Sequence, residues 1–109
     1  MNILYSAQAM RDLDRIWDDI VRVSASYDTA DLYINGIRDT VKEKQDHPKS
    51  GTPLYYENLF LGFWSVRHKA YRAFYRIHND SIQVLRVLPM QADYMRILFT
   101  ESPVACHDN

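Results

Sequence analysis

The segment FWSVRHKAYRAFYRIHNDSIQVLRVLPMQADYMRILF, residues 63–99, decides the fold of this chain. Within it, large apolar side chains alternate with polar and basic ones at a period of two, which is typical of β-strands. The alternation predicts three strands, and the return to helical spacing after Met90 predicts a short closing helix. Asn79 and Asp80 separate the second and third strands. They indicate a hairpin turn, because both residue types tolerate positive φ.

Alternation within the second strand assigns its side chains to two faces. Tyr71, Ala73 and Tyr75 fall on one face, whereas Arg72 and Arg76 fall on the other. The third strand, residues 82–89, is largely apolar on both faces, as expected of a central strand that is covered from both sides.

Two helices are predicted ahead of this segment. Ser6 can cap a first helix, whose apolar residues recur at helical spacing over residues 10–21. The same spacing continues over residues 30–41, and Gly36 interrupts this second helix. A close contact with the first helix would explain the glycine, which otherwise costs helix stability. Two helices joined by a short connection form a hairpin whose apolar face needs a sheet to cover it.

The remaining segments complete an α+β domain. Residues 2–5 form an apolar run of strand length, whereas residues 46–62 are interrupted by proline and glycine and indicate a long, partly ordered connection. The expected order is β-α-α-β-β-β-α: an N-terminal strand, a helical hairpin packed on an antiparallel β-sheet, and a short C-terminal helix. We assign residues 1–100 to a single domain and residues 101–109 to a flexible C-terminal tail.

The composition of the 109-residue chain excludes several classes of protein. Its formal net charge of -1 does not attract nucleic acid through overall charge. Cys106 is the only cysteine, so no internal disulfide can form, which fits a reducing cytosol. No secretory leader opens the sequence, and no apolar run approaches the length of about 18 residues that a membrane span needs. We therefore expect a cytoplasmic protein without a membrane partner.

Positive charge is concentrated on the predicted strands of a chain that is otherwise mildly acidic. The basic residues are Arg67, Lys69, Arg72, Arg76 and Arg86. Because an arginine costs too much to bury unpaired, these side chains must face water, acidic groups or an anionic partner. Clustered guanidinium groups bind phosphate and carboxylate well. Two interpretations stay open, a solvated face or a binding surface, and the nearby Trp64, Tyr71 and Tyr75 add weight to the second.

No pattern in the sequence indicates a metal ion or a cofactor. The histidines lie in no metal-ligand spacing, and neither a Gly-rich phosphate loop nor a nucleophile elbow is present. His68, between Arg67 and Lys69, is the only histidine that we consider as an acid or base. Tyr94 opens the closing helix, where its hydroxyl either faces a phosphate or lies at the rim of the core.

Three parts of the sequence together resemble toxins of the RelE/ParE superfamily from bacterial type II toxin–antitoxin systems. They are AMRDLDRIWDDI at residues 9–20, PKSG at residues 48–51, and the group YRAFYRI, NDSI, VLRVL and ADY within residues 71–94. The resemblance extends over almost the whole chain up to about Phe99. It implies a fold of two helices against a curled antiparallel sheet, which matches the order expected from periodicity.

The resemblance implies two alternative activities. RelE-like members are ribosome-dependent mRNA endonucleases that need no metal, and the candidate catalytic residues here would be Arg67, Arg72, Arg86 and Tyr94. Residues 89–93, Pro-Met-Gln-Ala-Asp, lack the histidine and the basic residues that often follow the last strand in the family. ParE-like members instead inhibit DNA gyrase, and the first-helix match favours this activity. A small interaction domain that keeps the fold without toxicity is a third alternative.

Both activities imply a cognate antitoxin as binding partner. Such an antitoxin joins a DNA-binding half to a disordered segment that folds along the toxin. The residues expected to bind a partner are Arg67, Lys69, Arg72, Arg76, Arg86 and Trp64. The cellular target would be DNA gyrase or the ribosome with its mRNA. Assembly as a homodimer or as a toxin–antitoxin hetero-oligomer is compatible with the family.

Overall fold

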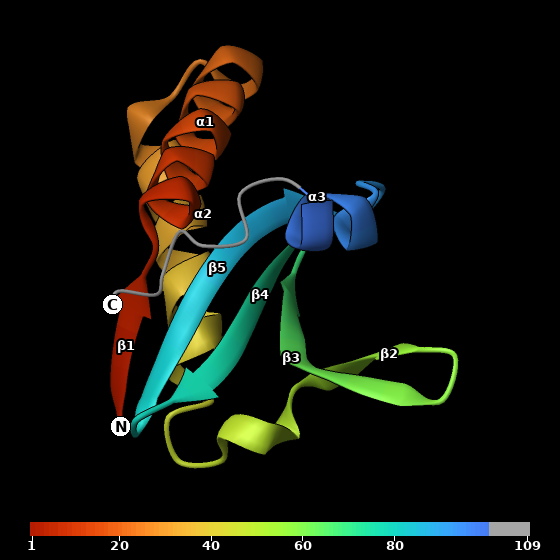
Figure 1. Ribbon diagram of the computed structural model, residues 1–109. Coiled ribbons are helices and arrows are strands. Elements are labelled where there is room, and N and C mark those ends of the chain that lie inside the picture. The colour runs from red at the N-terminus through yellow and green to blue at the C-terminus, as the bar shows by residue number, and fades with distance from the viewer. Residues whose placement is uncertain (101–109) are drawn as a thin grey trace.

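The computed structural model describes residues 1–100, which form a five-stranded sheet with helices on both faces (Figure 1). The elements are β1 (Asn2–Tyr5), α1 (Ala7–Ser24), α2 (Tyr27–Lys42), the 3-10 turn η1 (Pro48–Ser50), β2 (Thr52–Tyr56), β3 (Leu59–His68), β4 (Tyr71–His78), β5 (Ser81–Pro89) and α3 (Tyr94–Thr100). Residues 101–109 lie outside the described part of the chain, so the predicted C-terminal tail, with Cys106, stays a prediction.

The strand order β1-β5-β4-β3-β2 places the first and last strands of the chain side by side. β1 runs parallel to β5, with Asn2 opposite Ser81 and Tyr5 opposite Val84, whereas all other neighbouring strands are antiparallel. The α+β class, the N-terminal strand, the helical hairpin and the C-terminal helix are confirmed. The parallel pair is an addition to the predicted antiparallel sheet.

The segment 46–62 differs from the long connection that the sequence predicted. It contains η1, the whole of β2 and the first residues of β3, and the two strands form a hairpin in which Tyr55 pairs with Phe60. Proline and glycine were read as breakers of regular structure, but Pro53 is tolerated because β2 is an edge strand. Gly62 has a φ of 85° within β3, a conformation that favours glycine.

The helical hairpin covers one face of the sheet and supplies much of the core. Residues buried at helical spacing are Ala9, Leu13 and Ile16 on α1 and Ile37 and Val41 on α2. They pack against a set of apolar sheet residues, namely Ala73, Tyr75, Ile82, Val84 and Val87. Ser6 and Ser26 cap the two helices by accepting hydrogen bonds from backbone N–H groups in their first turns.

Gly36 of α2 lies against β3, so the predicted contact with the first helix was wrong. A Cβ atom at Gly36 would lie 2.6 Å from both Cε1 and Nε2 of His68. The imidazole also has its Nδ1 3.2 Å from Thr40 Oγ1 and meets the Tyr33 ring edge-on, with 5.6 Å between the ring centres. The glycine is required because the histidine ring occupies the space where a side chain would stand.

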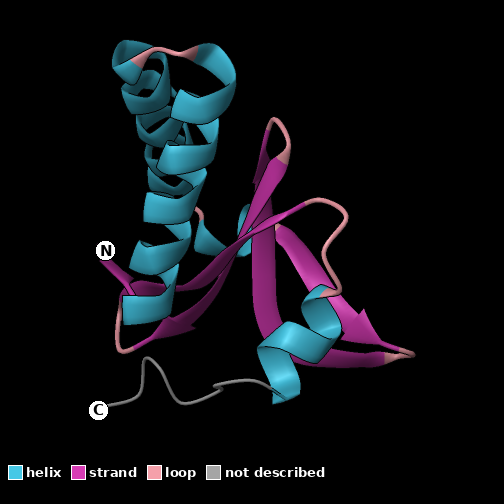
Figure 2. Cartoon of the chain, turned by 90° about the horizontal axis from the view of Figure 1, so that it is seen from above, coloured by secondary structure: helices cyan, strands magenta, loops and turns pink. Residues whose placement is uncertain are grey.

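The opposite face of the sheet carries a second, smaller core beneath α3. It consists of Leu54, Phe74, Leu88 and Leu98, with Leu61, Phe63, Ala92, Tyr94 and Ile97 packed against it. Figure 2 shows the helical hairpin on one side of the sheet and α3 on the other. The same face carries the arginines of β3 and β4, of which Arg72 lies against Tyr94 at the start of α3.

Candidate functional site

The alternation of β4 places its arginines on the face that α3 partly covers. Arg72 is opposite Arg67 of β3 and Leu88 of β5, and Phe74 stands between Arg72 and Arg76 along the strand. Since Phe74 and Leu88 belong to the second core, the three arginines share its side of the sheet. We call Arg67, Arg72 and Arg76 the arginine face.

None of the three arginines of this face forms an ion pair within residues 1–100. Arg67 is exposed and its Nε donates to the backbone oxygen of Lys69 at 2.8 Å. Arg76 is half-buried and its Nε donates to Gln83 Oε1 at 2.8 Å. These contacts position the guanidinium groups without neutralising them. The arrangement therefore suits an anionic partner.

Tyr94 closes one end of the arginine face at the start of α3. Its ring stacks on Phe74 with 5.1 Å between the ring centres, and the guanidinium carbon of Arg72 lies 5.8 Å from the centre of the Tyr94 ring. Stacking and the cation–π contact hold the ring in place. The ring is thus packed against the second core, and a contact of its hydroxyl with a phosphate stays a prediction.

Arg86 does not join the arginine face, because β5 contains a bulge. Phe74 pairs with Arg86 and Tyr75 pairs with Val84, so Leu85 is an extra residue and the simple alternation expected for this strand fails there. The Arg86 guanidinium binds Asp12 of α1 through Nε at 2.8 Å and Nη2 at 3.0 Å. The Arg86 charge is therefore paired with Asp12 and stabilises the packing of α1 on β5.

Asp12 is the residue that sequence reasoning missed, because an aspartate on an amphipathic helix is ordinarily expected on the solvated face. Its side chain is 2% exposed and also accepts a hydrogen bond from the backbone N–H of Val87 at 2.9 Å. β1 ends at Tyr5, so β5 continues beyond Val84 without a strand neighbour on that side. Asp12 accepts the hydrogen bond from Val87 N–H that a neighbouring strand would otherwise accept. The signal was available: Asp12 is three residues after Ala9 and four before Ile16, on the buried stripe of the helix.

Trp64 and Lys69 lie away from the arginine face. Trp64 points to the helix side, where it stacks on Tyr75 with 6.1 Å between the ring centres. Lys69 stands in the turn between β3 and β4 with a φ of 54°, and its Nζ lies 5.5 Å from the centre of the Tyr33 ring. The aromatic residues expected among the arginines are on the opposite side of the sheet, because the period of two separates them.

His68 is also on the helix side, so the histidine considered as an acid or base is not part of the arginine face. Burial, and after it the charge of Lys69, lowers the pKa of His68 below its ordinary value. The neutral ring packs between α2 and β3, against Gly36 and Thr40. Within residues 1–100 no group of three His, Cys, Asp or Glu side chains is placed to hold a metal ion. No helix of that part of the chain is long and apolar enough to cross a membrane.

Comparison with known proteins identifies the family. The model of the ParE toxin of type II toxin–antitoxin systems, parDE, matches residues 3–94. This chain belongs to the ParE toxin family. The match confirms the resemblance drawn from the sequence, including its preference for ParE, and makes the chain a toxin of the type II toxin–antitoxin class.

Solved structures agree with membership of the ParE family. The chromosomal ParDE toxin–antitoxin system of P. aeruginosa is 25% identical with a TM-score of 0.68, covering 84% of this chain and 97% of that one. The RelBE toxin–antitoxin complex of Mycobacterium tuberculosis is 22% identical (TM-score 0.54, 84% and 92% covered) and shares the fold. So does the YoeB/ParE toxin of Agrobacterium tumefaciens, at 19% identity (TM-score 0.54, 82% and 98% covered). A search of curated protein sequences finds no significant match.

Proposed function

We propose that this ParE-family toxin arrests bacterial growth by inhibiting DNA gyrase and that a cognate antitoxin neutralises it. The observation that carries the proposal is the match of the ParE family model to residues 3–94. The ParDE system of P. aeruginosa, at 25% identity over nearly its whole length, supports it. The protein would act in the cytoplasm as an inhibitory binding protein.

The arrangement of the arginines supports binding more than RNA cleavage. Of the four residues that cleavage would require, Arg86 is bound to Asp12 and Tyr94 is held between Phe74 and Arg72. The arginine face keeps three positive charges without acidic partners within residues 1–100. We assign this face to an acidic segment of the antitoxin, because complementary charge speeds encounter and fixes register.

A RelE-like, ribosome-dependent mRNA endonuclease is the second candidate. It is favoured by one observation, the direct cross-strand pairing of Arg67 with Arg72 beside Tyr94. Two guanidinium groups so placed can bind one phosphate, as transition-state stabilisation in RNA cleavage requires. Arg86 would then act indirectly. The non-toxic interaction domain is the remaining alternative.

Induced expression in bacteria, with and without the adjacent small gene, separates these functions. For the gyrase inhibitor we expect growth arrest, intact messages and loss of DNA supercoiling, all reversed by the small gene. Arrest with messages cut at defined codon positions would replace the gyrase proposal by the endonuclease. Normal growth with abundant folded protein would support the interaction domain and contradict both toxic activities.

Antitoxin capture tests the arginine face separately. Arg72→Gln removes one charge from the face, whereas Arg22→Gln removes one exposed charge from α1. We expect Arg72→Gln to weaken antitoxin binding several-fold at low salt, with less effect at high salt. Equal affinities for both variants would show that the antitoxin does not use this face.

A further inference from the structure

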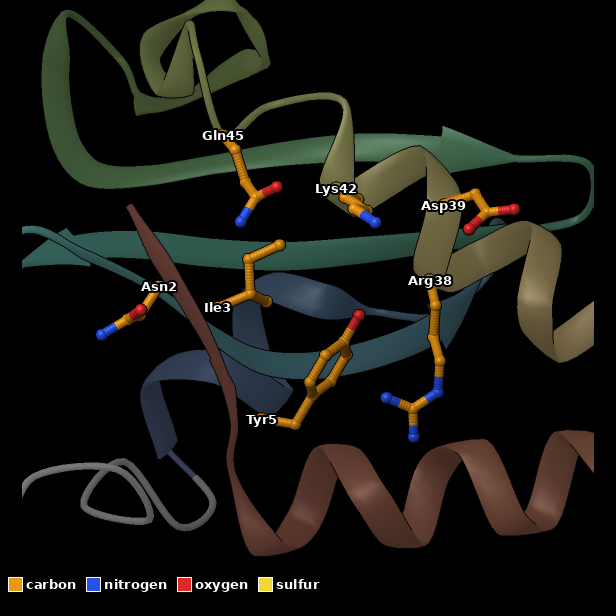
Figure 3. A pocket seen from close by; sticks show the side chains of 7 residues that line it. All are labelled: Asn2, Ile3, Tyr5, Arg38, Asp39, Lys42 and Gln45. Carbon is orange, nitrogen blue, oxygen red and sulfur yellow. The ribbon is translucent and has the colours of Figure 1, made fainter.

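A pocket of about 310 Å³ lies between the edge strand β1 and the last turns of α2 (Figure 3). It is lined by Asn2, Ile3 and Tyr5 of β1, Arg38, Asp39 and Lys42 of α2, and Gln45 beyond the helix. The pocket is on the helix side of the sheet, whereas the arginine face is on the other side. No sequence prediction included it.

The Tyr5 hydroxyl indicates that this pocket binds a ligand or a water molecule. Within residues 1–100 it is the one buried side-chain polar atom without a hydrogen-bond partner. Figure 3 shows it pointing from β1 toward α2, between the side chains of Ile3 and Arg38. A buried donor that lines a pocket needs a partner that enters the pocket, either a water molecule or a ligand oxygen.

Two basic side chains, Arg38 and Lys42, line the pocket together with the Tyr5 phenol. Arg38 and Lys42 are four residues apart, so they project from the same side of α2. Neither forms an ion pair within residues 1–100, although Asp39 lies on the same helix. The guanidinium carbon of Arg38 lies 4.8 Å from the centre of the Tyr5 ring, which orients the group through a cation–π contact.

We propose that this pocket binds the phosphate group of a small phosphomonoester. Arg38 and Lys42 are donors on the α2 wall, and the Tyr5 hydroxyl is a donor on the opposing β1 wall. A phosphate has three terminal oxygens to accept from them, whereas a carboxylate has only two. The volume exceeds what a bare ion needs and falls at the lower end of the range for small-molecule pockets, about 300–1,000 Å³, so the ester carbon and part of its substituent also fit.

The other groups that face the pocket limit the affinity. Burial raises the pKa of Tyr5, and the Arg38 charge offsets this only in part, so the phenol keeps its proton at neutral pH and remains a donor. Asp39 and the carbonyl groups at the C-terminus of α2 oppose an anion. Binding is therefore modest and salt-dependent. Gln45 Nε2 already donates to the Met1 backbone oxygen at 2.8 Å, so that amide nitrogen helps shape the pocket wall.

Calorimetric titration of the full chain with adenosine monophosphate, inorganic phosphate and adenosine tests the proposal at constant ionic strength. We expect the monophosphate to bind, inorganic phosphate to bind more weakly, and adenosine not to bind. Tyr5→Phe and Arg38→Gln should each weaken binding about tenfold or more, the loss expected for one hydrogen bond to a charged group. Lys49→Gln, which removes an exposed charge from η1 outside the pocket, should bind as the wild type does.

Tyr5→Phe also separates a ligand site from a structural role. Because its hydroxyl has no partner in the protein, the variant should unfold at the same temperature as the wild type or higher when no phosphate is present. Adenosine binding as tightly as its monophosphate, or equal losses in Arg38→Gln and Lys49→Gln, would overturn the proposal. So would a Tyr5→Phe protein that is less stable yet binds unchanged.

Discussion

Replacing Asp12 by alanine tests how the helical hairpin is fastened to the sheet. The carboxylate is 2% exposed and accepts three hydrogen bonds from β5, two from the Arg86 guanidinium and one from the Val87 N–H. The Arg86 side chain is itself only 15% exposed. Alanine removes the acceptor for all three donors and leaves the buried N–H of Val87 without its acceptor.

The expected cost follows from these contacts. Removing one partner of a buried ion pair costs about 3–5 kcal/mol, and a buried N–H without an acceptor costs about 1–3 kcal/mol. These two costs overlap, and Arg86 keeps interactions besides the one with Asp12, which reduces the penalty of losing that partner. We therefore expect Asp12→Ala to lower the free energy of unfolding by about 3 kcal/mol. For a domain of this size each kcal/mol lowers the melting temperature by about 4–8 °C, which gives a fall of roughly 12–24 °C.

Urea unfolding followed by tryptophan fluorescence measures this loss. Arg15→Ala is the matched control, because Arg15 also contacts Asp12, at 3.4 Å, but is 67% exposed. The control should stay within about 0.5 kcal/mol of the wild type. If the free energy of unfolding of Asp12→Ala lay within about 1 kcal/mol of the wild-type value, the reasoning would be refuted. Equal losses in both variants would show that the exposed Arg15–Asp12 pair, and not the contact with β5, provides the stability.

Three further predictions concern the contacts between helices, turn and sheet. Gly36→Ala should destabilise the fold by about 1–2 kcal/mol in urea, because the new Cβ would stand 2.6 Å from the His68 ring; a gain in stability would contradict that contact. His68 has a lowered pKa, so the folded protein binds its proton less readily than the unfolded chain, and stability should be complete above pH 6.5 and fall below it. Unfolding at pH 7.5 and 5 should show a smaller loss for His68→Gln, and an unchanged loss would exclude this histidine as the cause. Tyr75→Phe should cost about 1 kcal/mol in the same assay, since the buried hydroxyl donates to the backbone oxygen of Pro48; a neutral effect would show that water replaces the bond.

The parts of the fold predicted correctly from sequence are those that local periodicity determines. β4 has an uninterrupted period of two, so the sides taken by Arg72 and Tyr75 were predicted before any strand partner was known. The two helices followed from their apolar stripes in the same way. Local spacing carries this information because each side chain's direction depends only on its own element.

The parts that were missed depend on partners distant in the sequence. Nothing local marks Leu85 as the bulge residue that removes Arg86 from the arginine face, because a bulge is defined against the paired strand. β2 was missed because Pro53 is acceptable only on an edge strand, and its edge position emerges from the whole sheet. The pocket beside Tyr5 joins β1 to α2, and no motif connects them.

The pairing of β1 with β5 also sets the order of events during synthesis. Asn2 lies opposite Ser81, so the N-terminal strand must wait until nearly eighty more residues have been made before it can join the sheet. At about 5–20 residues per second this delay is roughly 4–16 s, long compared with the formation of either helix. Once Lys42 has been made, the nascent chain contains both helices of its hairpin but not yet the strands of a complete sheet. The complete five-stranded sheet, and any activity that requires it, therefore cannot form until Ser81–Pro89 has been made, which gives an antitoxin already present time to meet the chain.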